Sequence, residues 1–270
     1  MSEEATQNKI KSISRFLRGT SNWMYPIAGT TGFLLLWHLL TTVTGVFPAL
    51  LVPSPTRVVS EFLRLRELII SNLMTTLWVS IVGFTLAAVT GIGFGLIISM
   101  DESVKEGLIP LLIGGNSVPR IAFAPVIIFY VAVVNPKYLI AAWIGFFPIL
   151  INSIEGFESI DEDLERLMRS LDITTLQEYK AVRIPHALPY IFDGLKVGGI
   201  TAAVGAIAAE FVMADEGLGV LTLFALRNSN PALALAVVGI MAFAGVILLF
   251  TLFILQDRLV YWQDSDLITG

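Results

Sequence analysis

The sequence has no cysteine among its 270 residues, which excludes disulfides, thiolate metal sites and cysteine nucleophiles. It has only two histidines, His38 and His186, which stand in unrelated places and offer little for an enzyme site. No phosphate-loop lysine motif occurs, so ATP hydrolysis is expected on another chain. Charged residues make up 14% of the chain and the formal net charge is −5, which argues against a nucleic-acid surface.

Apolar residues dominate instead. They make up 55% of the chain, and the mean hydropathy of +0.78 is that of a membrane protein. A helix needs roughly 20 apolar residues to cross the hydrocarbon of a bilayer. Six runs qualify, at about 24–44, 70–99, 108–133, 138–157, 190–213 and 232–256. The sequence therefore predicts an all-α, polytopic membrane protein with six transmembrane helices.

The distribution of Lys and Arg predicts the orientation. With the N-terminus inside, eleven of these residues fall on the cytoplasmic side and five on the other, while Arg120 falls within a span. We therefore expect a multi-pass protein of the plasma (inner) membrane with both termini in the cytoplasm. Residues 1–23 would form a cytoplasmic N-terminal arm, and residues 24–270 a transmembrane domain with a polar cytoplasmic loop at about 158–189.

The polar loop begins with a predicted surface helix. Ser159-Ile160-Asp161-Glu162 has the form of a capping box, and the acids at 161–163 suit the positive end of a helix dipole. Because the helix dipole explains these three acids, we do not predict a metal site there. Apolar residues then recur on one helix face, at Ile160, Leu164, Leu167, Met168 and Leu171.

A second short helix is predicted after a turn at Asp172. Thr175-Leu176-Gln177-Glu178 offers another capping box, and Pro185 is expected to stop the helix. Pro189 then marks the entry of the next span. A plain connection needs neither cap, so we interpret the loop as a rigid element that a soluble partner grips; a merely solvated loop is the alternative.

Several segments resemble one family of proteins. Val182-Arg183-Ile184-Pro185 resembles the end of the "EAA" loop of ATP-binding-cassette (ABC) importer permeases, although 166–168 and Asp172 depart from the start of that motif. Four further segments resemble the nitrate, sulfonate, taurine and bicarbonate branch of these permeases. They are VPSPTRVVSEF (52–62), SVPRIAFAPVIIFY (117–130), ALPYIFDGLKVG (187–198) and AAEFVMADEGLG (208–219).

The resemblance implies a type I importer permease (MetI-like) fold and a set of partners. Two copies of the chain would form the pathway as a homodimer, two ABC ATPase subunits would each hold one loop, and an extracytoplasmic solute-binding protein would deliver the solute. The permease itself would carry no cofactor, since ATP and Mg would sit on the ATPase. The residues expected to couple to the ATPase are Leu167, Met168, Leu171, Asp172, Ile173, Thr174, Thr175, Glu178 and Pro185.

Charged residues inside spans invite a functional hypothesis, because a charge is costly in lipid. Pro119 and Pro125 flank Arg120 and are expected to break the third span, which is tolerated where a segment lines a cavity. The candidate pathway residues are Asn116, Ser117, Arg120, Phe123 and Glu210. An Arg120–Glu210 pair that serves only helix packing is the alternative. The small residues of the fifth span, from Gly194 to Ala209, predict close helix contact at a dimer or pore seam.

Two other classes of protein stay open on the sequence alone. An ion-coupled secondary transporter would normally show two related halves, and no internal repeat is evident. An integral-membrane enzyme would need clustered catalytic groups. Within the importer reading, Arg120 favours a small anion such as nitrate, bicarbonate or a sulfonate, while neutral or aromatic pyrimidine-type solutes also occur in this branch.

Overall fold

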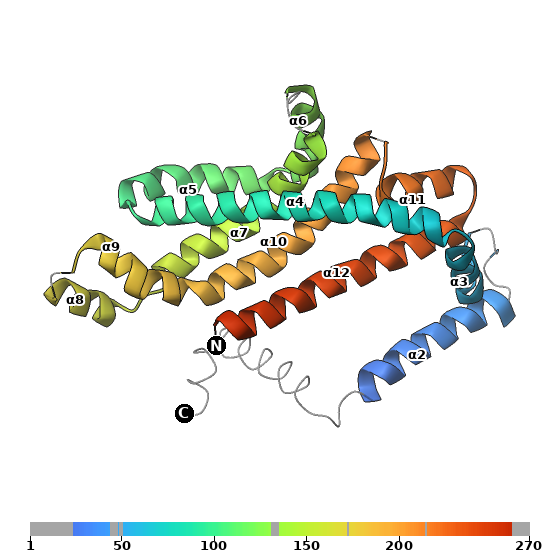
Figure 1. Ribbon diagram of the computed structural model, residues 1–270, viewed down its shortest axis with the longest axis horizontal. Coiled ribbons are helices and arrows are strands. Elements are labelled where there is room, and N and C mark those ends of the chain that lie inside the picture. The colour runs from blue at the N-terminus through green and yellow to red at the C-terminus, as the bar shows by residue number, and fades with distance from the viewer. Residues whose placement is uncertain are drawn as a thin grey trace. The chain divides into compact units, whose positions relative to one another are not determined.

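The computed structural model describes residues 24–43, 48, 51–130, 135–171, 173–213 and 215–260. Every regular element in these ranges is a helix, as Figure 1 shows. In chain order they are α2 (Met24–His38), the π-helix η1 (Leu39–Val43), α3 (Pro55–Arg64), α4 (Arg66–Ser99), α5 (Glu102–Ser117), the 3₁₀-helix η2 (Arg120–Phe123), α6 (Ala124–Tyr130), α7 (Pro136–Glu158), α8 (Glu162–Ser170), α9 (Thr175–Glu178), the π-helix η3 (Tyr179–Arg183), α10 (Ile184–Met213), α11 (Leu218–Arg227) and α12 (Pro231–Leu259). The predicted cytoplasmic arm, residues 1–23, lies outside the described residues.

The chain divides into two compact units. One comprises Met1–Leu65 with Ala225–Ala236, and the other comprises Arg66–Phe224 with Val237–Gly270. Within the first unit, the indole N–H of Trp37 in α2 donates to the carbonyl of Pro53 at 3.2 Å. Helix α3 begins at Pro55, whose fixed φ suits the first position of a helix. This bond ties α2 to the residues just before α3.

The core of the second unit is a close packing of α4, α7 and α10. Glycines line the contacts because a side chain would not fit between the helices. A Cβ at Gly205 of α10 would lie 2.9 Å from the Cα of Ala141, and one at Gly145 of α7 would lie 2.9 Å from the carbonyl of Gly198. The predicted small-residue face of the fifth span therefore makes close helix contact, as expected. Its described contacts are with α4, α7 and α12 of the same chain, and the dimer or pore seam stays a prediction.

Within the described ranges, four helices are long and apolar enough to cross a membrane. They are Arg66–Ser99, Pro136–Glu158, the continuous helix Thr175–Met213, and Pro231–Leu259. They match the second, fourth, fifth and sixth predicted spans. The first predicted span becomes α2 followed by the π-turn η1, and the third becomes the broken series α5, η2 and α6.

The third predicted span is interrupted at Pro119, as expected, but not at Pro125. Helix α5 ends at Ser117, and Val118 adopts an extended conformation with ψ of 136° because Pro119 disfavours helical geometry in the residue before it. The 3₁₀-turn η2 then leads into α6. Pro125 causes no break, because it stands in the first turn of α6 where no N–H is needed. The polar run 101–106 is not a plain link: Asp101 caps α5 by accepting from the amide of Ser103 at 2.8 Å.

The predicted stop at Pro185 is wrong. The helix runs without a break through α9, η3 and α10, from Thr175 to Met213, and includes Pro189 in its interior. The π-turn explains how proline is tolerated. The amide of Ile184 bonds to the carbonyl of Tyr179, five residues back, so the register shifts just before Pro185.

Candidate functional site

The polar loop folds into a compact elbow, which we define as residues 160–185. Its first helix, α8, is capped by Asp161, whose carboxylate accepts from the amide of Asp163 at 3.3 Å. The predicted capping box at Ser159 does not form, because the Ser159 hydroxyl instead donates to the carbonyl of Gly156 at the end of α7. Asp161 is therefore the N-cap of α8, and its negative charge is favoured at the positive end of the helix dipole.

The second capping box exists, but one residue earlier than predicted. Thr174 is the N-cap of α9, and its hydroxyl accepts from the amide of Gln177 at 3.4 Å. The side chain of Gln177 accepts in return from the amide of Thr174 at 2.9 Å. The reciprocal pair satisfies two amides at the start of α9.

The predicted coupling residues differ in exposure. Leu167 of α8 and Leu171, just after its end, are 53% and 63% exposed, and Leu176 of α9 is 77% exposed, so each presents an apolar side chain at the surface. Met168 is only 4% exposed and packs inward. Of the others, Thr174 and Thr175 are exposed, Ile173, Glu178 and Pro185 are half-buried, and Asp172 lies outside the described residues.

Polar contacts bind the elbow to the ends of the neighbouring helices. The guanidinium of Arg183 donates to the carbonyl of Phe157 in α7, and the phenol of Tyr179 donates to the carbonyl of Ser99 in α4. Nearby, Lys105 of α5 pairs with Glu158 of α7 at 3.1 Å. The hydrogen bonds of Lys105 to Glu158 and Glu102 raise the pKa of its ammonium group above the ordinary value.

The predicted pathway residue Arg120 lies beside an aromatic cluster. Its guanidinium donates to the carbonyl of Ile144 at 3.2 Å and lies 5.4 Å from the centre of the Phe147 ring. Trp143 contacts both Phe123 and Phe147 edge-on, with ring centres 5.3 and 5.1 Å apart. Asn116 and Ser117 end α5 close by in sequence, but their side chains are outside the described part of the structure. The structure thus brings Arg120 and Phe123 to one region.

Two cavities lie among the helices of the second unit. One, of about 330 Å³, is lined by Thr90, Phe94, Ile127, Leu139, Ala142, Trp143 and Phe146. The other, of about 230 Å³, lies between α4, α10, the start of α11 and α12, and Thr76, Ser80 and Phe84 are part of its lining. Both are almost wholly apolar, which suits lipid-facing or side-chain packing surfaces better than a polar binding site.

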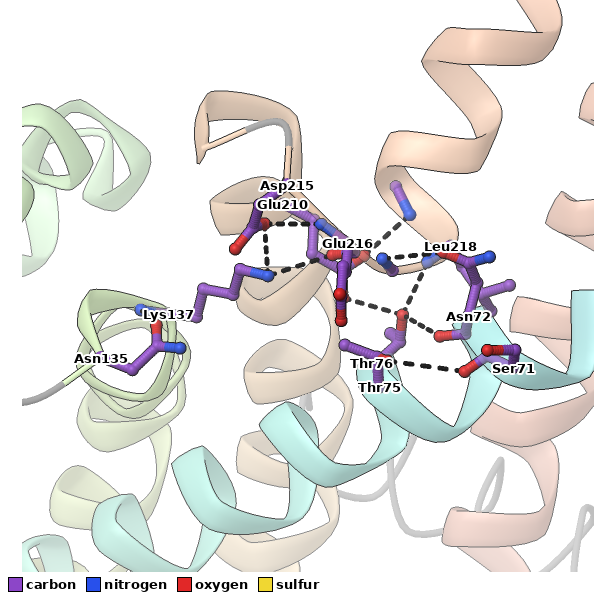
Figure 2. A network of polar contacts seen from close by, with 12 residues as sticks. Ser71, Asn72, Thr75, Thr76, Asn135, Lys137, Glu210, Asp215, Glu216 and Leu218 are labelled. Carbon is purple, nitrogen blue, oxygen red and sulfur yellow. Dashed lines mark hydrogen bonds and ion pairs between the residues drawn. The ribbon is translucent and has the colours of Figure 1, made fainter. Parts of the chain in front are cut away.

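Glu210 takes part in a buried polar network that does not include Arg120. Figure 2 shows its carboxyl group turned toward α4 and the start of α11. One oxygen accepts from the hydroxyl of Thr76 at 2.8 Å, and the other accepts from the amide of Gly219 at 2.8 Å. The side chain is fully buried. These contacts support the packing interpretation of Glu210, with a partner other than the arginine considered from the sequence.

Three successive amides at the start of α11 are satisfied by side chains of other helices. The amide of Gly217 donates to Asn72, that of Leu218 to Thr76, and that of Gly219 to Glu210, at 3.0, 2.8 and 2.8 Å. The first amides of a helix have no partner within the helix, and a carboxyl group is favoured there by the dipole. Glu210 and α4 together therefore act as the cap of α11.

Gly217 allows this close approach. Its φ of +121° lies in a region that L side chains rarely adopt, and a Cβ would collide with the Glu210 carboxyl group. Glycine is therefore required at this position for two independent reasons.

A buried lysine completes the network. Lys137, whose side chain is 3% exposed, pairs with Asp215 at 2.5 Å and donates to the carbonyl of Glu216 at 3.0 Å (Figure 2). Burial raises the pKa of Asp215, but the hydrogen bond and the charge of Lys137 outweigh it and hold the pKa below its usual value. The loop 215–219 is thus attached to α4, α7 and α10.

Sequence reasoning missed most members of these networks. We assigned no role to Asn72, Thr76 or Lys137 from the sequence. The sequence held one indication of the position of Lys137. Asn135 and Pro136 are typical of a helix start, which places Lys137 in the first turn of α7. Partners from helices distant in sequence could not be assigned without the fold.

The helical fold and the elbow between two long helices define a class of protein, the helical permease subunits of membrane transporters. Residues 87–269 match the family described as "Binding-protein-dependent transport system inner membrane component". The chain belongs to this family. It is therefore an ABC importer permease, a transport subunit rather than an enzyme.

Known proteins agree with this assignment. The chain is 29% identical over 263 residues to the riboflavin transport system permease protein RibX of Chloroflexus aurantiacus, covering 95% of this chain and 98% of RibX. It is 28% identical over 221 residues to the formylaminopyrimidine transport permease protein ThiX of Halalkalibacterium halodurans, covering 79% and 88%. It is 29% identical over 212 residues to the bicarbonate transport system permease protein CmpB of Synechococcus elongatus, covering 73% and 74%.

A solved structure has the same fold. The inward-facing MetNI methionine ABC transporter matches with a TM-score of 0.60 and 17% identity, covering 73% of this chain and 97% of that one. The type I importer permease (MetI-like) fold is thereby confirmed.

Proposed function

We propose that two copies of this chain form the translocation pathway of an ATP-driven importer in the plasma membrane, with both termini in the cytoplasm. Two ABC ATPase subunits, which carry ATP and Mg, each grip one elbow, and an extracytoplasmic binding protein delivers the solute. The elbow carries this proposal. It exposes Leu167, Leu171 and Leu176 to a partner while its polar groups fasten it to the transmembrane helices.

The elbow works as a lever. Closure of the ATPases on ATP displaces 160–185, and the attached helices tilt with it. The exposed leucines supply the apolar contact, and Thr174 with Thr175 lies at the turn between the two short helices. Met168 is buried, so its role is to pack α8 against the rest of the chain rather than to contact the ATPase.

The solute is proposed to be a small anion such as nitrate, bicarbonate or a sulfonate. Arg120 provides a positive charge at the break in the third span, beside Phe123. Asn116 and Ser117 come a few residues before it in the sequence. Relatives of the chain are named for bicarbonate and for aliphatic sulfonates. The second candidate is a heteroaromatic solute, favoured by the cluster of Phe123, Trp143 and Phe147 and by the relatives named for riboflavin and formylaminopyrimidine.

Reconstitution tests the proposal. The chain, its ATPase and its binding protein in liposomes should take up one of nitrate, bicarbonate, taurine, riboflavin or a pyrimidine, and uptake should require both ATP and the binding protein. Uptake of an anion that falls in Arg120→Ala while the complex stays assembled supports the anion assignment. Uptake without ATP would refute the importer mechanism, and uptake of riboflavin or the pyrimidine alone would favour the heteroaromatic candidate.

A further inference from the structure

Arg183 connects three separate segments through one guanidinium group. Its Nε donates to Glu178 of α9 at 2.5 Å, and a second nitrogen pairs with Glu165 of α8 at 3.7 Å. The third nitrogen donates to the carbonyl of Phe157 at 3.1 Å, in the last turn of α7. The side chain is only 15% exposed. Both helices of the elbow are thereby tied to the helix that precedes it.

The chemistry of this position requires arginine. The last carbonyls of a helix have no partner within the helix, and a cation is favoured at that end by the dipole. A guanidinium carries its donors on three nitrogens in a fixed planar fork, whereas a lysine ammonium has its three donors on one nitrogen at the end of a flexible stem. The three acceptors around Arg183 therefore match its forked shape.

Tyr179 makes a second attachment from the same π-turn. Its side chain is 7% exposed, and its hydroxyl donates to the carbonyl of Ser99, the last residue of α4, at 2.8 Å. The guanidinium of Arg183 lies 5.2 Å from the centre of the Tyr179 ring. The two ends of η3 are thus fastened to α4 and α7.

The π-turn is an irregular segment of the long helix. Residues Tyr179–Arg183 join the elbow to α10, and π-turns are rare interruptions of regular helical bonding. A displacement of the elbow could be absorbed by bending at this turn. The Arg183–Glu178 pair spans this turn, from the residue before it to its last residue, and the other contacts of Arg183 link this point to α8 and α7.

We propose that Arg183 is a positioning residue that makes the elbow move as one body with α7 and α10, so that the motion driven by the ATPase reaches the far end of the spans. This inference rests on the proposed function, because it assumes that the elbow receives that motion. Without Arg183 the ATPase still docks, but the motion is lost at the π-turn.

The test measures docking and transmission separately in the complete complex with its ATPase. The chain has no cysteine, so single cysteines can be placed freely. Thr174→Cys carrying a maleimide–benzophenone photo-cross-linker reports docking to the ATPase. Glu216→Cys, exposed in the loop before α11, reports transmission through its reaction rate with a membrane-impermeant maleimide. Both are measured without nucleotide and after trapping with ADP and vanadate.

Arg183→Gln should keep the cross-link but lose the nucleotide-dependent difference in Glu216→Cys labelling. Arg183→Lys should keep part of that difference, because lysine keeps the positive charge but lacks the planar set of donors of the guanidinium. Lys180→Gln is the matched control, since it removes one positive charge from an exposed position of the same π-turn and should behave as the parent. If Arg183→Gln does not assemble, Glu178→Gln, which removes the negative charge that pairs with Arg183, should show the partial loss instead.

Two results separate the possible failures. If the parent protein shows no cross-link and no nucleotide-dependent labelling, the proposed function is wrong. If the parent shows both, and every assembled variant at Arg183 and Glu178 retains the full difference, the role assigned to Arg183 is wrong while the proposed function stands.

Discussion

At Glu210, a single carboxyl group holds the first turn of α11 against α4 and α10. A buried donor that loses its acceptor costs about 1–3 kcal/mol. Glu210→Ala leaves the amide of Gly219 without its partner, so we expect the free energy of unfolding to fall by about 1–3 kcal/mol. Thermal unfolding in detergent measures this.

Glu106→Ala is the control for that change, because Glu106 is exposed in α5. Glu210→Gln should fall between the two, since an amide keeps one acceptor oxygen. An unfolding temperature of Glu210→Ala equal to that of Glu106→Ala would show that the capping contacts do not stabilise the protein.

Gly217 should be intolerant of any side chain. Gly217→Ala places a Cβ against the Glu210 carboxyl group and strains a φ of +121°, so we expect a loss of stability of roughly 1–3 kcal/mol. Gly93→Ala is the matched control, because no atom lies within 4 Å of its Cβ position and a helical alanine is favoured over glycine. Comparable unfolding temperatures for the two variants would contradict the predicted clash.

The Lys137–Asp215 pair predicts a pH dependence. The pKa of Asp215 is lowered in the folded protein, so its contribution to stability is complete above the ordinary value of 3.8 and is lost as the pH falls through the lower folded value. Asp215→Asn should therefore lower the unfolding temperature at pH 7, and the difference from the parent should shrink in strong acid. A difference that does not change with pH would show that the ion pair is not its cause.

At the scale of elements, periodicity and length were enough to predict the apolar helices. Runs of apolar residues predict a span whatever its neighbours, so α4, α7, α10 and α12 were found. The break predicted at Pro119 is present, whereas the helix stop predicted at Pro185 is not. The difference lies in the π-turn before Pro185, which depends on Arg183 and Tyr179 finding partners on α7 and α4. Such tertiary contacts cannot be deduced from local propensity.

The capping residues of the elbow also depend on contacts that the local sequence does not determine. Sequence patterns indicated two caps, and two caps are present, but at Asp161 and Thr174 rather than at Ser159 and Thr175. Several neighbouring residues can cap equally well, and the choice depends on where the preceding helix ends. Boundaries are therefore the least predictable feature.

The packing of α7 on α10 makes a direct prediction. Gly205→Ala places a Cβ 2.9 Å from the Cα of Ala141, which is backbone and cannot move aside, so we expect a loss of about 1–3 kcal/mol from overpacking. Gly107→Ala, on an exposed face of α5 with no atom within 4 Å, should be neutral or slightly stabilising. Equal stability of the two variants would contradict the close approach of the two helices.

At the scale of the whole molecule, the structure places two kinds of polar cluster at opposite ends of α10. The elbow lies at its start, where Tyr179 and Arg183 attach it to α4 and α7. The capped loop 215–219 lies past its end, attached to the same two helices by Asn72 and Lys137. A rigid core of three glycine-packed helices connects the two ends. This arrangement suits a subunit that converts a push at one membrane face into a change at the other.

Docking of the ATPase on the elbow is the claim on which this mechanism depends most. Its most direct measurement is photo-cross-linking from a benzophenone on Thr174→Cys in the complete complex, with and without ATP. We expect the ATPase subunit to be captured, and capture to fall when Leu167 and Leu171 are both changed to Asp. No captured ATPase under any nucleotide condition would contradict the account.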